Sequence, residues 1–416
     1  MVMRLTRLTL NRFKNIALED GFAPGELAVL IGPNGCGKSN LVNVLRFLKK
    51  AMTGVQEEDV GGTVWANALD DILGGPGILD ATLTPPQTVQ MAFDFEGENW
   101  PDGIRFEWEL GVRRDPSWVF IQREWLRPVR NFSETDGPFY YRFDGGESGP
   151  GSLIVPGYNW LGSQSTQQEI KLRDLLCFKA ANQETALAHK GQSLVDSIAQ
   201  WRFYSANDMK LKEIRSAEPK VGLPATVLSD SGENLLTVFD NLCQLDIEFE
   251  ERINEACREI LPETRTIRPA RVGRLNLGVE WYVRGIKDPF YLRDMSDGTV
   301  RMLCWAVILK SPKPATLLVL DEPELGLHVV WMPILAKWIK RAAARGTQVI
   351  VATHSSDLLD HFGDQIDHVH CFQYGENGRF AVRPLSPERL AARLEEGWQL
   401  GDLYRVGDPD VGGWPW

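Results

Sequence analysis

The sequence lacks the features of a membrane or secreted protein. It contains no run of 18 or more apolar residues, so it predicts no membrane-spanning helix. Charges at Arg4, Arg7 and Arg12 break up the N-terminal stretch and argue against a signal peptide. The six cysteines form no C-x-x-C pair and no regular spacing, which excludes the common zinc motifs and a disulfide framework. We therefore expect reduced thiols, a cytoplasmic location and no membrane contact.

Internal repeats, low-complexity tracts and long heptad arrays are also missing, which argues against a long coiled coil. Acidic residues are in excess: 56 Asp and Glu face 45 Lys and Arg, for a net charge of −11 at pH 7. This balance excludes polyanion binding over the whole surface, so nucleic-acid contact would need a local basic patch. A chain of 416 residues, 43% of them hydrophobic, is typical of a globular protein with about two or three domains.

Hydrophobic periodicity predicts alternating strands and helices. The expected strands are residues 4–10, 27–31, 88–95, 118–121, 317–320 and 349–352. The expected helices are residues 38–50, 167–205, 234–261, 300–309 and 332–344, with loops or a hairpin over 131–165. The strands at 317–320 and 349–352 with the helix between them form a βαβ unit, which predicts a parallel sheet.

A glycine-rich segment follows the second of these strands and fits the phosphate-loop pattern G-x-x-x-x-G-K-[ST]. Its glycines allow tight turns that aim backbone N–H groups at phosphate oxygens, and the next helix presents its positive N-terminus to the same anion. Lys38 is expected to reach the β- and γ-phosphates, and the Ser39 hydroxyl to bind Mg²⁺. The predicted nucleotide-binding residues are Gly32, Pro33, Asn34, Gly35, Cys36, Gly37, Lys38, Ser39 and Asn40.

Polar residues end both strands of the βαβ unit. Asp321 and Glu322 follow the apolar run at 317–320, and His354 follows the run at 349–352. We expect Asp321 to hold Mg²⁺ through water and Glu322 to polarise the attacking water as a general base. His354 is expected to hydrogen-bond the γ-phosphate or that water. The predicted catalytic residues are Lys38, Glu322 and His354, and the predicted metal ligands are Ser39 and Asp321.

Together with two further segments, these elements resemble the ABC-type ATPase superfamily in its RecF-like and OLD-like branch. Met295–Thr299 resembles the signature loop, and Glu324–His328 resembles the D-loop. Asn15 lies in a segment typical of RecF, SMC and OLD-type ATPases, and Ser229–Asn234 and the tail from Leu400 resemble a stand-alone ATPase group. The resemblance covers the chain except for residues 100–220.

The signature departs from the family pattern at two positions, with Met295 in place of Leu and Asp297 in place of the first Gly. No glutamine matches the Q-loop convincingly, because Gln87 precedes the strand at 88–95 and Gln90 lies near its start, so that neither is clearly at its end.

The resemblance implies an α/β fold: an ABC-type P-loop ATPase head with a mixed or antiparallel β subdomain and an inserted helical region. It implies an N-terminal lobe at 1–98, the insertion at 99–225 and a C-terminal lobe at 226–416. ATP and Mg²⁺ would be its cofactors. Ser296, Asp297 and Gly298 would contact the nucleotide of a second copy, so the chain would form a homodimer or higher homo-oligomer through its ATP sites. The implied function is an ATP-gated switch with a separately encoded effector, such as a nuclease, in anti-phage defence.

Two alternatives stay open. A DNA repair or recombination ATPase would bind DNA directly, and four arginines within ten residues offer a candidate track or a solvated strand face. They are Arg265, Arg268, Arg271 and Arg274. The engine of a membrane transporter fits less well without the Q-loop. Asp408 and Asp410 form a D-x-D pattern that we interpret as a loop and not as a nuclease acid pair.

Overall fold

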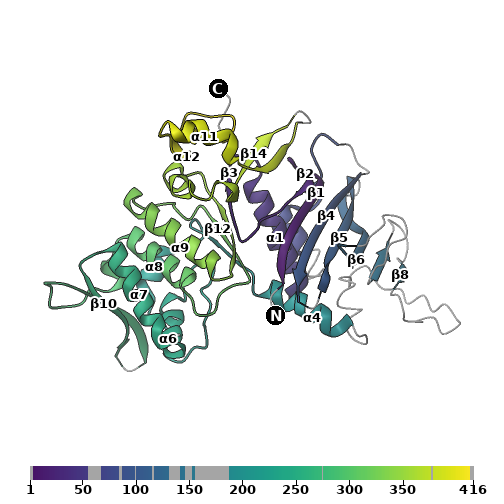
Figure 1. Cartoon of the computed structure of the whole chain (residues 1–416). Helices are drawn as coiled ribbons and strands as arrows, with labels where there is room; N and C mark the ends of the chain where they lie inside the picture. The colour runs from purple at the N-terminus through teal and green to yellow at the C-terminus, as the bar shows by residue number, and fades with distance from the viewer. Residues whose placement is uncertain are drawn as a thin grey trace. The chain divides into compact units, whose positions relative to one another are not determined.

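We describe the fold from a computed structural model of the chain (Figure 1). The structure describes residues 3–54, 67–83, 87–98, 100–114, 117–130, 141–145, 152–154, 187–273, 275–375 and 378–412. Within these ranges, no helix combines the length and apolar character needed to cross a membrane. The chain divides into two compact units. The first comprises Met1–Gly25, Leu30–Trp201 and His370–Leu385, and the second Glu26–Val29, Arg202–Val369 and Ser386–Trp416.

The first unit is built on a mostly antiparallel sheet. Its strands lie in the order β8-β7-β6-β5-β4-β1-β2-β15-β14, and β2 and β15 form a parallel pair. The strands are β1 Arg4–Phe13, β2 Ile16–Phe22, β4 Gln87–Gly97, β5 Trp100–Arg114, β6 Ser117–Pro128, β7 Tyr141–Asp144, β8 Ser152–Ile154, β14 Val369–Tyr374 and β15 Phe380–Pro384. The helices are α1 Lys38–Thr53 and α4 Leu187–Ala199, with short turns η1 Leu69–Leu73 and η2 Gly75–Ile78. Loops or a hairpin are expected over 131–165, and β7 and β8 form an antiparallel pair there, while residues 131–140, 146–151 and 155–165 lie outside the described part of the chain.

Helix α1 lies along one face of this sheet (Figure 1), and the side chains between them form a hydrophobic core. Phe93, Phe106 and Trp108 are at most 1% exposed, and the rings of Phe93 and Phe106 both pack edge-on against Trp108. Phe47 of α1 places its ring centroid 5.3 Å from that of Trp108. The period-2 alternation of β4 and β5 therefore sends the aromatic side chains to the helix and the charged side chains to the opposite face.

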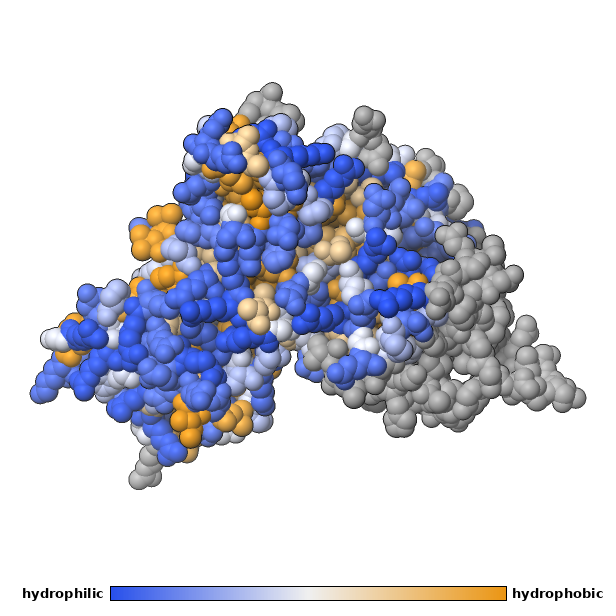
Figure 2. Space-filling model, in the orientation of Figure 1, coloured by the Kyte–Doolittle hydropathy of each residue, from blue (hydrophilic) through white to orange (hydrophobic). Residues whose placement is uncertain are grey.

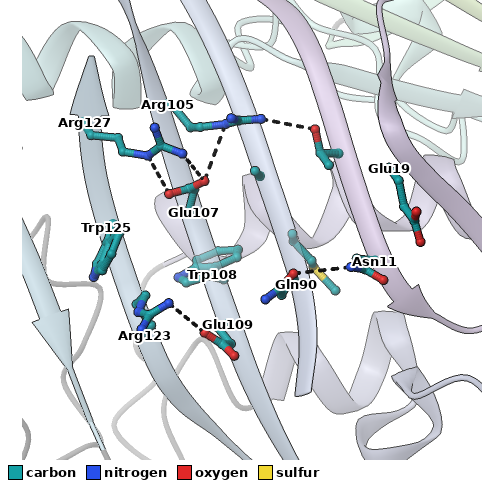
Figure 3. Close-up of a pocket in the computed structure, with 13 residues that line it drawn as sticks. Asn11, Glu19, Gln90, Arg105, Glu107, Trp108, Glu109, Arg123, Trp125 and Arg127 are labelled. Carbon is teal, nitrogen blue, oxygen red and sulfur yellow. Dashed lines mark hydrogen bonds and ion pairs between the residues drawn. The ribbon is translucent and has the colours of Figure 1, made fainter. Parts of the chain in front are cut away.

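The opposite face holds a cavity of about 570 Å³ over β1, β2, β4, β5 and β6. Figure 3 shows the residues that line it. Arginines and glutamates alternate across it and form ion pairs. Glu107 accepts hydrogen bonds from Arg127 Nε and Nη2 at 2.7 and 2.8 Å, and Arg123 pairs with Glu109 at 3.1 Å. We call Arg105, Glu107, Glu109, Arg123 and Arg127 the sheet-face lattice.

The second unit contains the parallel strands in the order β13-β12-β9, surrounded by helices. The strands are β9 Arg202–Ser205, β10 Thr264–Val272, β11 Asn276–Val283, β12 Leu317–Asp321 and β13 Gln348–Ala352. The α-helices are α5 Leu211–Ser216, α6 Leu235–Leu245, α7 Ile247–Ile260, α8 Asp297–Leu309, α9 Met332–Ala344, α10 Ser356–Leu359, α11 Pro387–Glu395 and α12 Leu400–Arg405. Short 3₁₀ turns are η4 Leu292–Asp294, η5 Val329–Trp331, η6 Asp360–Phe362 and η7 Ile366–His368. The predicted βαβ unit is confirmed, with β12 parallel to β13 and α9 between them.

Two helix predictions are wrong in part. The helix expected over 167–205 is helical at Leu187–Ala199, but residues 202–205 form β9, because pairing with β12 overrides the helical pattern. Residues 167–186 lie outside the described part of the chain. The helix expected over 234–261 breaks at Asp246, which is extended and accepts a hydrogen bond from Glu248 N as the N-cap of α7.

Strand β3 (Leu27–Ile31) is fully buried and leads into the phosphate loop. The side shown in Figure 2 is mostly hydrophilic, and hydrophobic side chains form separate small patches on it. The division into lobes at 1–98 and 226–416 with an insertion at 99–225 stays a prediction.

Candidate nucleotide site

The phosphate loop lies in the first unit between β3 and α1. Gly32, Gly35 and Gly37 have φ values of 147°, 76° and 110°, which residues other than glycine rarely adopt. A Cβ added at Gly32 would lie 2.8 Å from Phe372 Cβ, and one at Gly37 would lie 2.6 Å from Ile16 Cγ1. The loop therefore needs glycine for its backbone turns and for its close contacts with the sheet.

Side chains brace this loop from inside the same unit. Lys38 is 6% exposed, and its Nζ donates to Gly32 O at 2.7 Å and to Pro33 O at 3.2 Å. Asn15 Nδ2 donates to Gly35 O at 2.7 Å, and Asn40 Nδ2 donates to Asn15 Oδ1 at 3.0 Å. The ammonium group of Lys38 is thus held over the loop by carbonyl oxygens, where a phosphate can replace them.

The loop and the start of α1 fit a bound phosphate group. Helix α1 begins at Lys38, its N-cap Gly37 supplies no side-chain hydrogen bond, and its first turn contains no acidic residue. The first N–H groups of the helix and its positive end therefore suit an anion. Ser39 is exposed at the same turn, where its hydroxyl could ligate Mg²⁺. Burial raises the pKa of the Cys36 thiol, so that residue stays neutral beside Lys38.

The predicted acids and histidine are brought together in the second unit. Strands β9, β12 and β13 run parallel, with Ser205 opposite Asp321 and Asp321 opposite Ala352, so all three end at one edge. Glu322 follows β12 in a left-handed conformation with φ of 48°, and its N–H donates to Ala352 O at 2.8 Å. A glutamate in this region is strained, and strain of this kind gathers at functional sites.

The Glu322 carboxylate has a neighbour on each side. His354 Nε2 lies 3.8 Å from Glu322 Oε1, and Asn207 Nδ2 donates to Glu322 Oε2 at 3.2 Å. The Glu322 side chain is 34% exposed, so water can reach it. This arrangement suits a general base whose carboxylate is oriented by the two neighbouring strand ends.

A second carboxylate supports the histidine. Thr353 Oγ1 donates to Glu324 Oε1 at 2.6 Å, and the His354 N–H donates to the same oxygen at 3.2 Å. Burial raises the pKa of Glu324 above its ordinary value, and these hydrogen bonds offset part of that effect. Glu324 therefore fixes the backbone that carries His354. From its position in the sequence, Glu324 is recognisable only as the first residue of the D-loop segment.

The signature segment forms the start of α8. Ser296 is the N-cap and accepts from Thr299 N at 3.2 Å, while Asp297 pairs with Arg215 at 2.6 Å. A Cβ added at Gly298 would lie 2.9 Å from the Trp331 ring and 3.3 Å from Gly326 O. Gly298 is therefore the residue that lets the signature helix approach the D-loop.

The weaker sequence features have ordinary structural roles. Arg268 on β10 pairs with Glu280 at 3.0 Å and stacks over Tyr282, while Arg274 lies outside the described residues. Asp408 and Asp410 lie in a turn and pair with Arg393 at 3.0 and 2.9 Å. Among the described residues, no group of three or more His, Cys, Asp and Glu could hold a metal ion by itself. Gln87 starts β4 and Gln90 lies within it, so neither ends the strand.

Comparison with known proteins fits these observations. The family described as "AAA domain, putative AbiEii toxin, Type IV TA system" matches residues 27–360. The Old nuclease of Escherichia phage P2 is 22% identical over 86% of this chain and 58% of its own length. The UvrABC system protein A of Mycoplasma genitalium is 26% identical over 43% of this chain and 17% of its own length. The chain thus spans less than two thirds of either relative.

Among solved structures, the Smc head bound to the C-winged helix domain of ScpA is similar in fold. Its TM-score is 0.53 at 16% identity, over 92% of this chain and 99% of that chain. The predicted α/β P-loop ATPase head is thereby confirmed as the fold. Since the family match extends over well more than half of the residues and begins at the strand before the phosphate loop, the chain belongs to this AAA-domain family and is a P-loop ATPase of the ABC/AAA type.

Proposed function

We propose that the chain binds Mg·ATP and hydrolyses it. Lys38 and the loop amides bind the β- and γ-phosphates, and Glu322 takes the proton of the attacking water while His354 orients the reacting groups. Mg²⁺, held by Ser39 and through water by Asp321, would neutralise charge that develops on the phosphates. The observation that carries the proposal is the Glu322 carboxylate next to His354, on a backbone with a strained φ of 48°, at an edge where three parallel strands end.

The hydrolysis cycle works as a switch between two copies of the chain. Ser296, Asp297 and Gly298 of one copy contact the γ-phosphate bound to the other, so ATP closes a homodimer and hydrolysis opens it. The N-terminus of α8 is exposed, and this supports the assignment. Ser296 caps the Thr299 N–H and Arg215 pairs with the Asp297 carboxylate, so the first backbone N–H groups of the helix remain to face an anion. The exposed apolar residues Leu325, Val329 and Val330 of the adjacent segment would be covered in such a dimer.

The output of the switch is a separately encoded effector, such as a nuclease, in bacterial anti-phage defence. The RecF-like and OLD-like motifs and the similarity to a phage nuclease support this role. Location in the cytoplasm follows from the same proposal.

The first experiment measures the solution mass of the Glu322→Gln variant by light scattering, with and without Mg·ATP. We expect a shift from 46.8 kDa to twice that mass, because ATP stays bound and unhydrolysed. A mass that stays at one chain with ATP bound would contradict the two-copy switch.

The control tests hydrolysis separately from assembly. Phosphate release by the wild type is compared with Lys38→Ala, which removes the buried phosphate contact, and with Lys50→Ala, an exposed lysine in the last turn of the same helix. We expect Lys38→Ala to lose ATP binding and Lys50→Ala to behave as wild type. Equal rates in all three would contradict the assignment of the phosphate loop.

A further inference from the structure

Asn207 is the third polar residue at the edge where the parallel strands of the second unit end. Strand β9 stops at Ser205, directly opposite Asp321 of β12. The Ala206 N–H then donates to Asp321 O at 3.2 Å, which extends the pairing by one residue. Asn207 thus comes after β9 as Glu322 comes after β12 and as His354 comes after β13.

A tight turn fixes the position of Asn207. Its N–H donates to Ser205 Oγ at 3.2 Å, and the Asp208 N–H donates to Ser205 O at 3.2 Å. Ser205 and Ala206 are 5% and 1% exposed, and Met209 is 6% exposed, so the turn is anchored on both sides. Asn207 itself is exposed and reaches outward from a buried frame.

Asn207 contacts Glu322, the proposed general base. Its Nδ2 donates to Glu322 Oε2 at 3.2 Å, while His354 Nε2 lies 3.8 Å from the other oxygen, Oε1. An ionised carboxylate can only accept hydrogen bonds, so the NH₂ group of Asn207 must face it. Asn207 thus fixes Oε2 of Glu322 from the side of β9, while Oε1 faces His354 and can accept a hydrogen bond from water.

We propose that Asn207 is a positioning residue that orients the Glu322 carboxylate for water activation. The inference rests on the proposed hydrolysis of ATP. A neutral amide suits this role, because it holds the carboxylate without a compensating positive charge that would weaken it as a base. A hydrogen bond at an exposed site contributes little to folding stability, so the expected loss on its removal is in turnover.

The test compares three variants of the full chain by kcat, KM for ATP and thermal midpoint. Asn207→Ala removes the amide, and Asn207→Asp keeps its shape but replaces the donor with a like charge beside Glu322. We expect Asn207→Ala to lower kcat by about 10-fold to 100-fold with KM nearly unchanged, and Asn207→Asp to lower it further. The control is Asn241→Ala, since the Asn241 amide donates to Leu223 O and Ala225 O and should affect only the midpoint.

A double variant shows whether Asn207 acts through Glu322. In the Glu322→Gln background, Asn207→Ala should change the residual rate by less than about 2-fold, because residues that act as a unit are not additive. Wild-type kcat in Asn207→Ala would overturn the proposal, and so would an equal further loss in the Glu322→Gln background. A raised KM with unchanged kcat would also overturn it, by making Asn207 a nucleotide-binding residue. Absence of hydrolysis in the wild type would instead show that the proposed function itself fails.

Discussion

Carboxylates are neutralised differently in the two units. In the sheet-face lattice of the first unit they pair with arginines, whereas Glu322 and Glu324 of the second unit lie at strand ends beside neutral groups. Glu107 accepts two hydrogen bonds from Arg127, and the Arg105 guanidinium lies 3.6 Å away. Within the described residues, the Glu322 carboxylate accepts a hydrogen bond from the amide of Asn207 and lies 3.8 Å from the His354 imidazole, and the Glu324 carboxylate is close enough to repel it. Among the described residues, no Lys or Arg forms an ion pair with Glu322.

The backbone differs in the same sense. Glu107 lies in regular β5, whereas Glu322 has a φ of 48°. The half-buried Glu324 accepts hydrogen bonds from neutral donors only, within the described residues. A carboxylate already neutralised by arginine has little to offer a ligand, while an uncompensated one at a strand edge can bind a metal or take a proton. We therefore expect the carboxylates of the sheet-face lattice to stabilise the fold, and those at the ends of the parallel strands to act on a ligand.

The largest expected effect comes from removing one carboxylate of each kind without changing its size. Glu322→Gln should lower kcat by about 100-fold to 10,000-fold and keep ATP binding, because the general base is lost. Glu107→Gln should leave kcat within about 2-fold, since its carboxylate faces only lattice arginines. Phosphate release at saturating ATP measures both, and a comparable loss in Glu107→Gln would remove the distinction.

The second effect is on folding stability and should be confined to the lattice. Arg127→Ala leaves the half-buried Glu107 with only the longer 3.6 Å pair to Arg105 among its ion pairs in the described residues, and we expect the free energy of unfolding to fall by about 1–3 kcal/mol. Arg130→Ala is the matched control, because its pair with Glu96 is 3.5 Å long and exposed and should contribute less than about 1 kcal/mol. Urea unfolding measures the free energy of unfolding of both variants. Equal losses of this free energy would show that the sheet-face lattice is an ordinary set of surface ion pairs.

Local signals in the sequence were enough to predict the phosphate loop, the βαβ unit and the strand ends at Glu322 and His354. Each depends on residues that are close in the chain: glycine spacing, a buried run, a polar residue after it. The bounds of β3, α9 and α1 agree with the prediction to within a few residues.

Contacts between distant segments could not be predicted in this way. Asn207 meets Glu322 across 115 positions, and Asn15 meets the phosphate loop across 20. Strand β9 has only four residues and follows a helical pattern, so its pairing with β12 left no periodic signal. The sequence before Asn207 offers only Phe203 and Tyr204 followed by small residues, a pattern too common to predict a strand.

The third effect concerns pH. Burial raises the pKa of Glu324, so from about pH 4.5 up to its raised pKa the folded chain keeps a proton that the unfolded chain has lost. The contribution of Glu324 to stability must therefore fall as pH rises through that window and stay at its lower level above it. We expect Glu324→Gln to remove this slope, which cannot exceed about 1.4 kcal/mol per pH unit. Urea unfolding from pH 4 to pH 8 measures the difference, and parallel curves for both proteins would contradict the assignment.

The smallest effect is expected at the exposed arginines of β10. They test whether arginines that already form ion pairs can still bind a ligand. Arg268 is already paired with Glu280 and stacked on Tyr282, so like Arg127 it has little charge to offer a ligand. Changing Arg268 and Arg271 to Ala should lower stability by less than about 1 kcal/mol and leave any binding of duplex DNA unchanged. Fluorescence titration at several salt concentrations tests this. If the wild type binds DNA with a steep salt dependence that the double variant loses, then paired arginines can still bind phosphates, and the DNA-binding ATPase becomes the better account of the chain.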